Sequence, residues 1–285
     1  LGRPGRALSA ATRDALAVKA FTATAAYDAA ISGWLRGRLG GGSVERFPAR
    51  LVTGFRKKQA LRYGENPHQA AAVYEDVPPV PGSLVNARQL SGKEISHNNY
   101  LDFDSALAIV RDFAEPCCAV IKHRNACGTA IGGDLAAAVR RAVRADSLSA
   151  FGGMVAVNRR VDLPTARVIL EVLQEAKKFD GFVAPAFDPE ALALLRDKPA
   201  PFPGKNMVVL ETGEEGTRAG GLLMRTVNGG LLAQEPDRRP VGEADLKVVT
   251  KRSPTAEERR DLLFAWTVCG HIVSNAIVFA KDGVT

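Results

Sequence analysis

The amino-acid sequence predicts an α/β protein, a layered mixed sheet with flanking helices. From about residue 47 onward, helical and strand patterns alternate along the chain, and such alternation is typical of sheets that are covered by helices. The strand candidates are short apolar runs, as expected for strands buried on both faces. With 285 residues, of which 46% are hydrophobic, the chain can bury a sizeable core.

The N-terminal stretch predicts a helix that stands apart. Residues 11–35 repeat apolar residues at helical spacing and stop before a glycine-rich stretch, which is typical of a flexible linker. A single helix cannot bury its own apolar face. We therefore expect 1–38 to be the terminal helix of a domain whose main body is absent, 39–46 to be a linker and 47–285 to be the main domain.

Six elements of the main domain follow in alternation. Helical spacing marks three of them, and short apolar runs mark the other three. In chain order they are helix 104–113, strand 117–121, helix 134–145, strand 152–157, helix 164–178 and strand 181–185. After the strand that reaches Lys122, we expect the chain to continue as a glycine-punctuated loop as far as residue 133.

Another helix and strand are predicted near the C-terminus. The capping-box pair Thr255 and Glu258 begins a helix over 256–270, and the apolar run 275–280 follows as a strand.

The helix-then-strand units at 102–122 and 256–281 resemble each other in outline, and both strands end at a lysine. Internal duplication explains this likeness, and so does chance similarity between two amphipathic helices that precede apolar strands. The chain stops just after the second strand, so we expect it to be a fragment of a larger protein.

The excess of positive charge is local. Residues 1–63 hold 12 Lys and Arg against 3 acids, whereas the rest of the chain holds 26 against 28. Aromatic and basic residues are not interleaved as in single-strand binders, which favours an anionic small substrate over nucleic acid as the partner. No apolar run approaches the roughly 20 residues of a membrane span, and no signal peptide is evident. We expect a cytoplasmic protein.

The four cysteines are too few for a disulfide scaffold, and they form no C-x-x-C pair that would hold zinc. They are Cys117, Cys118, Cys127 and Cys269. We expect reduced, buried thiols and chemistry that needs no metal.

Lys122 and His123 stand side by side where a buried strand stops. The junction of a rigid strand with a loop is where α/β proteins place reacting groups. The lysine charge favours the neutral imidazole of its neighbour, which is the state that a general base needs. A structural, hydrogen-bonded histidine would fit the same position.

Two polar segments hold further candidates. Residues 61–71 offer Arg62 as a fork of donors for a phosphate and Tyr63 as a rigid hydroxyl, although an ordinary polar loop has the same composition. Residues 90–106 offer asparagine side chains that suit a heterocycle with amide and amine groups. In that second segment we expect Asp102 or Asp104 to cap the following helix.

Paired glycines at 152 and 153 are expected at the start of a strand, where the backbone could approach a flat ligand or simply turn. The chain contains no G-x-G-x-x-G fingerprint and no P-loop.

Five separated motifs resemble, in the same order, those of the bifunctional purine biosynthesis family that joins AICAR (aminoimidazole carboxamide ribonucleotide) formyltransferase to IMP cyclohydrolase. They are LRYGENPHQ, LSGKEISHNNYLDFDSA, IKHRNACG, SAFGG and LLFAWTVCGHIVSNAIVFAKDG. The resemblance implies that the stretch before residue 39 is the end of the cyclohydrolase domain. It also implies that residues 47–285 are the larger first part of a duplicated, cytidine-deaminase-like formyltransferase domain, which lacks its C-terminal part and is poorly active alone.

The resemblance also implies a reaction and its residues. A formyl group would pass from the co-substrate 10-formyltetrahydrofolate to the 5-amino group of AICAR, giving FAICAR, in a homodimer whose sites lie at the interface. The catalytic residues implied are Lys122, His123 and Asn275. The substrate-binding residues implied are Arg62, Tyr63, His68, Asn99, Gly152 and Asp180, with His68 either contacting substrate or bracing its loop.

Two other functions remain open from the residues. A zinc-dependent deaminase would need an H-x-E type motif and a P-C-x-x-C motif, but His123 is followed by Arg124 and Asn125. A non-catalytic nucleotide-binding module would need no general base, and the Lys122–His123 pair argues only modestly against it.

Overall fold

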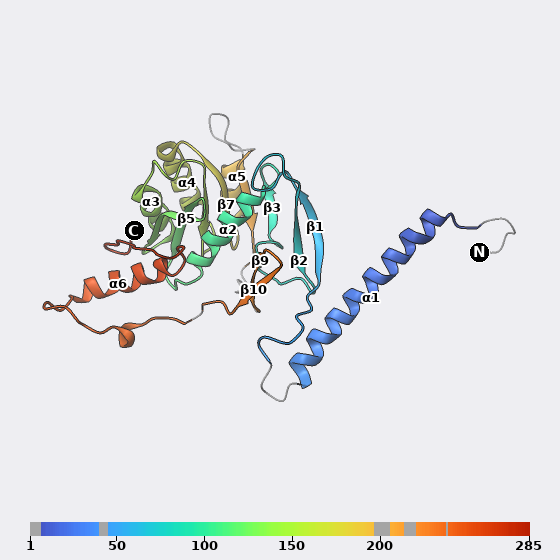
Figure 1. Cartoon of the computed structure of the whole chain (residues 1–285). Helices are drawn as coiled ribbons and strands as arrows, with labels where there is room; N and C mark the ends of the chain where they lie inside the picture. Colours follow the sequence, from blue (N-terminus) through green and yellow to red (C-terminus); the bar gives the residue numbers. More distant parts are fainter. Residues whose placement is uncertain (1–6, 40–44, 197–205, 214–220, 238) are drawn as a thin grey trace.

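The main domain of the computed structural model is a three-layer α/β/α sandwich around a six-stranded mixed sheet (Figure 1). The structure describes residues 7–39, 45–196, 206–213, 221–237 and 239–285. The predicted fold class is therefore confirmed. No helix within these residues is both long and apolar enough to cross a membrane.

The sheet combines parallel and antiparallel pairs. In spatial order its strands are β3 (Arg88–Ser91), β8 (Val208–Glu211), β7 (Phe179–Ala184), β6 (Gly153–Val157), β4 (Cys117–Lys122) and β5 (Asn125–Ile131). Strands β6, β7 and β8 are parallel, whereas β3, β4 and β5 pair antiparallel with their neighbours. One edge of the sheet is thus formed by the beginnings of β6, β7 and β8 together with the ends of β3 and β4.

The two faces of the sheet follow directly from the alternation of side chains along each strand. In β4, Cys118 and Val120 pack into one apolar cluster, whereas Cys117, Ala119 and Ile121 pack into another. The first cluster is covered by α3 (Leu135–Ala145), α4 (Leu163–Ala176) and α5 (Pro189–Arg196), and the second by α2 (His97–Val110). Because both faces are covered, β4 is a continuous apolar run up to its last residue.

Side-chain caps set the beginnings of these helices. Asp134 and Asp162 cap α3 and α4 by accepting a hydrogen bond from the backbone amide three residues on. Helix α2 begins at His97, earlier than predicted, because Ser96 is its N-cap and forms a capping box with Asn99. The expectation that Asp102 or Asp104 caps this helix is wrong, since both lie within it.

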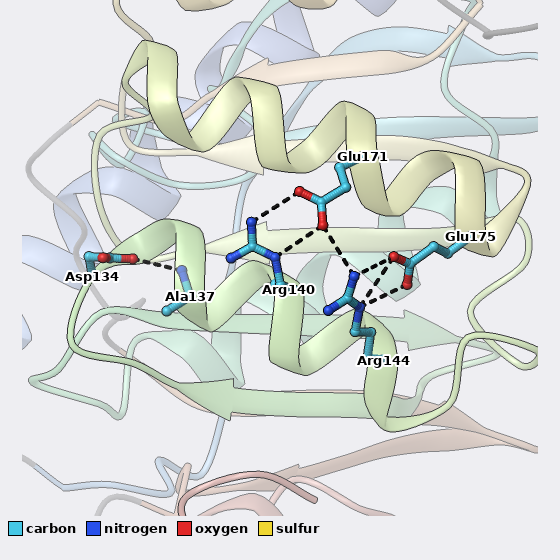
Figure 2. A network of polar contacts seen from close by, with 6 residues as sticks. All are labelled: Asp134, Ala137, Arg140, Arg144, Glu171 and Glu175. Carbon is cyan, nitrogen blue, oxygen red and sulfur yellow. Dashed lines mark hydrogen bonds and ion pairs between the residues drawn. The ribbon is translucent and has the colours of Figure 1, made fainter.

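Helices α3 and α4 are also joined by an ion-pair network on their outer surface (Figure 2). Arg140 pairs with Glu171, and Arg144 bridges Glu171 and Glu175 at 3.1 and 2.6 Å. All four side chains are at least one third exposed, so each pair adds little to stability on its own. The network aligns two helices that the apolar core already holds.

The remaining elements lie outside the layered sheet. Helix α1 (Ala10–Leu39) buries none of its residues, and it lies on the same side of the molecule as the hairpin of β1 and β2 and runs obliquely away from it (Figure 1). That it is the end of a separate domain stays a prediction. The bounds are β1 (Phe55–Leu61), β2 (Ala71–Asp76), β9 (Leu223–Val227), β10 (Gly230–Gln234), the short 3-10 helix η1 (Glu243–Asp245) and α6 (Ala256–Cys269). Most of the predicted linker falls outside the described residues.

Two further expectations for the main domain are wrong. Residues 125–131 are not a loop but strand β5, which pairs with β4 along its length. Residues 275–280 do not form a strand, although Ile277 and Phe279 are exposed and alternate with partly buried neighbours. A strand requires a partner for its backbone groups, and no described strand lies beside this segment. The likeness between the units at 102–122 and 256–281 therefore extends only to their helices.

We predict that Gly128→Ala destabilises the fold by about 1–3 kcal/mol, because there is no room for a methyl group between β5 and α3. An added Cβ at Gly128 would overlap the carbonyl oxygen of Ala142 and lie 2.9 Å from the Cβ of Ala145. The matched control is Gly133→Ala, where a Cβ would meet open space. Urea unfolding curves of the two variants measure the difference, and equal midpoints would contradict the predicted overlap.

The N-terminus of α6 should loosen in acid. Arg252 first, and the backbone amide of Thr255 second, lower the pKa of the Glu258 carboxyl from 4.5 to about 2. Because the folded pKa is depressed, the contribution of Glu258 is present above pH 4.5 and is lost as the pH falls toward 2. A carboxyl carbon NMR titration should show this midpoint, and Arg252→Gln should raise it. A midpoint near 4.5 in the unmodified protein would contradict the capping geometry.

Candidate functional site

The sheet topology brings distant parts of the sequence to one edge. Strand β4 runs antiparallel to β6, with Ile121 opposite Met154, so Lys122 at its end lies beside the beginning of β6. Strand β7 is parallel to β6 and begins at the same edge, with Phe179 opposite Gly153. We call this edge, with the loops and the helix terminus attached to it, the rim.

Lys122 and His123 lie on the rim, on either side of the point where the chain reverses. Lys122 pairs with Asn125, so His123 and Arg124 alone form the turn between β4 and β5. Both turn residues have positive φ angles, 55° and 68°, which match the twist of a two-residue hairpin turn. The imidazole of His123 is exposed at this tip, and Lys122 is half-buried beneath it.

Gly152 immediately precedes β6 and lies close to the Lys122 ammonium. The Lys122 ammonium donates a hydrogen bond to the carbonyl oxygen of Phe151, and its Nζ would lie 3.6 Å from a Cβ at position 152. Gly152 has a φ of 73°, a conformation that glycine adopts at low cost. The expectation that the paired glycines begin a strand is confirmed, because β6 starts at Gly153.

Asp180 extends the rim along β7. Its carboxylate pairs with the Lys178 ammonium at 2.8 Å and lies 3.8 Å from the Lys93 ammonium. Lys178 also accepts a hydrogen bond through its carbonyl oxygen from the amide of Gly152, at 2.7 Å. One carboxylate thus lies between two ammonium groups, which leaves this part of the rim positively charged.

The N-terminus of α2 forms the next part of the rim. The Asn99 side chain accepts a hydrogen bond from the Ser96 amide at 3.2 Å, while the Ser96 hydroxyl accepts from the Asn99 amide. Asn98 donates to the carbonyl oxygen of Glu65 at 3.2 Å. Sequence reasoning assigned no structural role to these asparagines, but both hold the backbone here. The side-chain carbonyl oxygen of Asn99 is thereby held in a fixed orientation at the N-terminus of α2.

The loop after β1 is attached to this helix terminus and carries Arg62, Tyr63 and His68. The amide of His97 donates to the carbonyl oxygen of Tyr63 at 3.4 Å. The Arg62 guanidinium stacks on the Tyr63 ring, with 4.7 Å to its centroid, and donates to its hydroxyl at 2.9 Å. Arg62 and His68 are exposed. A guanidinium on a rigid ring at the rim is suited to bind an anionic group.

Asn275 is not brought to the rim by the contacts of this chain. It is exposed, and its side-chain oxygen accepts a hydrogen bond from Ser274 at 2.9 Å. Four residues earlier, His271 pairs with Asp112 at 2.9 Å, beyond the C-terminal end of α2. On its other side, Gly283 accepts a hydrogen bond from the amide of Ile131, at the far end of β5. Figure 1 shows α6 beside the end of α2 that points away from β3.

A sequence profile described as the AICARFT/IMPCHase bienzyme matches residues 3–285. The chain belongs to this bienzyme family. The resemblance noted in the sequence is therefore confirmed. Members of this family are enzymes of purine biosynthesis. Its description names two activities, AICAR formyltransferase and IMP cyclohydrolase.

Asp102 also lies on the rim of this bienzyme chain, but the sequence had suggested it only as a helix cap and not as a residue of the site. Its carboxylate, on a side chain only 8% exposed, accepts a hydrogen bond from the Arg124 amide at 2.7 Å. Burial raises the pKa of the Asp102 carboxyl, while the backbone amides of Arg124 and His123 act in the opposite direction. The aspartate was visible in the sequence, but its partner is 22 residues away, and no local pattern connects them.

The cysteines of this family member are not arranged as metal ligands. Burial raises the pKa of the Cys117 and Cys118 thiols well above the usual range and that of the Cys127 thiol to about 11, which makes them unreactive. Within the described residues, no three His, Cys, Asp or Glu side chains are grouped so as to hold a metal ion. That the chemistry needs no metal stays a prediction.

A large groove of the bienzyme chain lies away from the rim. This groove of about 1690 Å³ is lined by α1 and by residues in the stretches 45–57, 76–78 and 221–239. None of the candidate catalytic or substrate-binding residues lines it. We base the candidate site on the rim instead, because the Lys122–His123 turn, the Asp180 ion pairs and the loop of Arg62 are all attached to this edge.

Proposed function

We propose that the rim is the AICAR formyltransferase site, where a formyl group passes from 10-formyltetrahydrofolate to the 5-amino group of AICAR. The observation that carries the proposal is the position of Lys122 close to Gly152, next to the His123 turn and at the edge of the sheet where the Asp180 ion pairs lie. Arg62 lies on the loop that is attached to the N-terminus of α2. Membership of the bienzyme family supports the same reaction. The cyclisation of FAICAR to IMP is proposed for the other part of the bienzyme.

The chemistry requires a base and a positive charge near each other. The amine of AICAR is a weak nucleophile, because its lone pair is delocalised into the imidazole carboxamide. Its nitrogen forms a bond to the formyl carbon, and the bond from that carbon to the folate nitrogen breaks. His123 takes the proton that the amine loses, and Lys122 stabilises the oxyanion that develops on the formyl oxygen. The proton that His123 has taken then passes to the folate nitrogen, which completes the exchange and restores the base.

The other rim residues suit recognition of the nucleotide. Arg62, supported by Tyr63, would bind the 5'-phosphate through charge-assisted hydrogen bonds. Asn99, Gly152 and Asp180 would contact the base and the ribose, and His68 lies on the same loop as the phosphate contacts. The positive charge near Asp180 would attract the anionic substrates.

In this proposal, the Asn275 that contributes to a formyltransferase site belongs to a second chain. Its neighbours on both sides are held at the edge of the sheet opposite the rim. If Asn275 helps to position the formyl group, as we propose, then a partner chain supplies it in a homodimer.

Replacement of His123 tests the assignment of the base. In the protein that carries this chain, His123→Ala should lower kcat by roughly 10² to 10⁴-fold, because proton transfer is lost. The affinity for AICAR should change little, since the base acts in the transition state. Single-turnover rates and calorimetric titration measure the two effects. Unchanged kcat would place the base elsewhere, and AICAR binding by the unmodified protein without formyl transfer would favour a nucleotide-binding module.

Replacement of Arg62 tests phosphate recognition. Arg62→Ala should weaken AICAR binding by about 2 kcal/mol, the order expected for hydrogen bonds to a charged group. The matched control is Lys57→Ala, which removes one exposed positive charge from the same hairpin and should leave affinity unchanged. Calorimetric titration distinguishes a specific contact from general attraction. Equal losses in both variants would remove Arg62 from the site.

A further inference from the structure

The turn that carries His123 is conformationally costly. A two-residue hairpin turn with positive φ at both positions favours sequences such as Asn-Gly, but here His123 and Arg124 occupy it. For residues other than glycine the left-handed conformation costs roughly 1–2 kcal/mol each. Such a conformation persists only when the surrounding structure holds it in place.

Asp102 is the group that holds this turn. It projects from α2 toward the tip of the hairpin, and its carboxylate accepts a hydrogen bond of 2.7 Å from the amide of Arg124. The amide of His123 also interacts with it. The carboxylate therefore anchors the turn at Arg124, the second of its two residues.

The stability of the fold does not explain a buried carboxylate at this position. Because burial raises the folded pKa of Asp102 above its ordinary value, it is the protonated form that favours folding. That contribution is lost as the pH rises through the folded pKa. The negative charge of this carboxylate therefore does not stabilise the fold. Its effect is local, on the turn.

We propose that Asp102 is a positioning residue for formyl transfer, which fixes the β4–β5 turn so that Lys122 and His123 face one substrate. This inference rests on the proposed function of the rim. Asp102 is buried beneath the hairpin, so it acts through the backbone of the turn and does not touch the reacting atoms.

The experiment compares Asp102→Asn and Asp102→Ala with the matched control Asp104→Asn, an exposed aspartate two residues along α2. In the protein that carries this chain, Asp102→Ala should lower kcat by about 10²-fold, the order expected when a catalytic group is misplaced by about 1 Å. The KM for AICAR should change less than threefold. The loss of kcat should be smaller in Asp102→Asn, which keeps an acceptor oxygen. Asp104→Asn should have the kcat of the unmodified protein.

A second substitution separates positioning from general stability. Glycine adopts positive φ without strain, so Arg124→Gly should restore part of the kcat lost in Asp102→Ala. The melting temperature of Asp102→Asn should not fall. The proposal would be overturned if Asp102→Ala kept the kcat of the unmodified protein. It would also be overturned if the loss of kcat paralleled a fall in melting temperature and Arg124→Gly did not restore it.

Hydrogen exchange at the Arg124 amide gives a readout that does not depend on the reaction. Exchange should be faster in Asp102→Ala than in the unmodified protein, and equal rates would overturn the role of the carboxylate in the turn. If the unmodified protein shows no formyl transfer, the proposed function fails, and with it this inference about catalysis. If His123→Ala is inactive and Asp102→Ala is fully active, only the positioning role fails.

Discussion

The antiparallel placement of β4 beside β6 is the constraint on which the candidate site depends. Strand β4 is buried along its length except at its last residue, and its direction brings that residue to the edge where β6 and β7 begin. A parallel β4 would have carried Lys122 to the opposite edge, away from Gly152 and Asp180. The site therefore results from one strand direction, and the apolar clusters on both faces of β4 keep that direction fixed.

Two conformationally costly residues lie at the same edge. His123 and Arg124 have positive φ angles there, and the buried carboxylate of Asp102 accepts a hydrogen bond from the Arg124 amide. The cores on the two faces contain mainly apolar side chains that impose no such cost. Functional sites commonly hold strain that a well-packed surrounding structure sustains, and this distribution is consistent with a site at the rim.

Local signals predicted much of the fold because each depends on few residues. Apolar runs predicted β4, β6 and β7, and helical spacing predicted α3, α4 and α6. The box of Thr255 and Glu258 predicted the beginning of α6. The same signals failed for β5, where glycines suggested a loop although the strand continues past Gly128 against α3. Glycine there serves the close approach of two elements, and sequence alone does not distinguish that role from a turn.

The sequence by itself determined the family motifs, the apolar periodicities and the Lys122–His123 pair at a strand end. These properties arise from neighbouring residues, whose spacing is fixed by the covalent chain. Only the tertiary structure decided that the apolar run 275–280 is not paired as a strand, that Asn275 lies away from the rim and that Asp102 supports the turn. Strand pairing and the burial of a carboxylate depend on partners supplied by distant segments, because hydrogen bonds and desolvation act through space and not along the sequence.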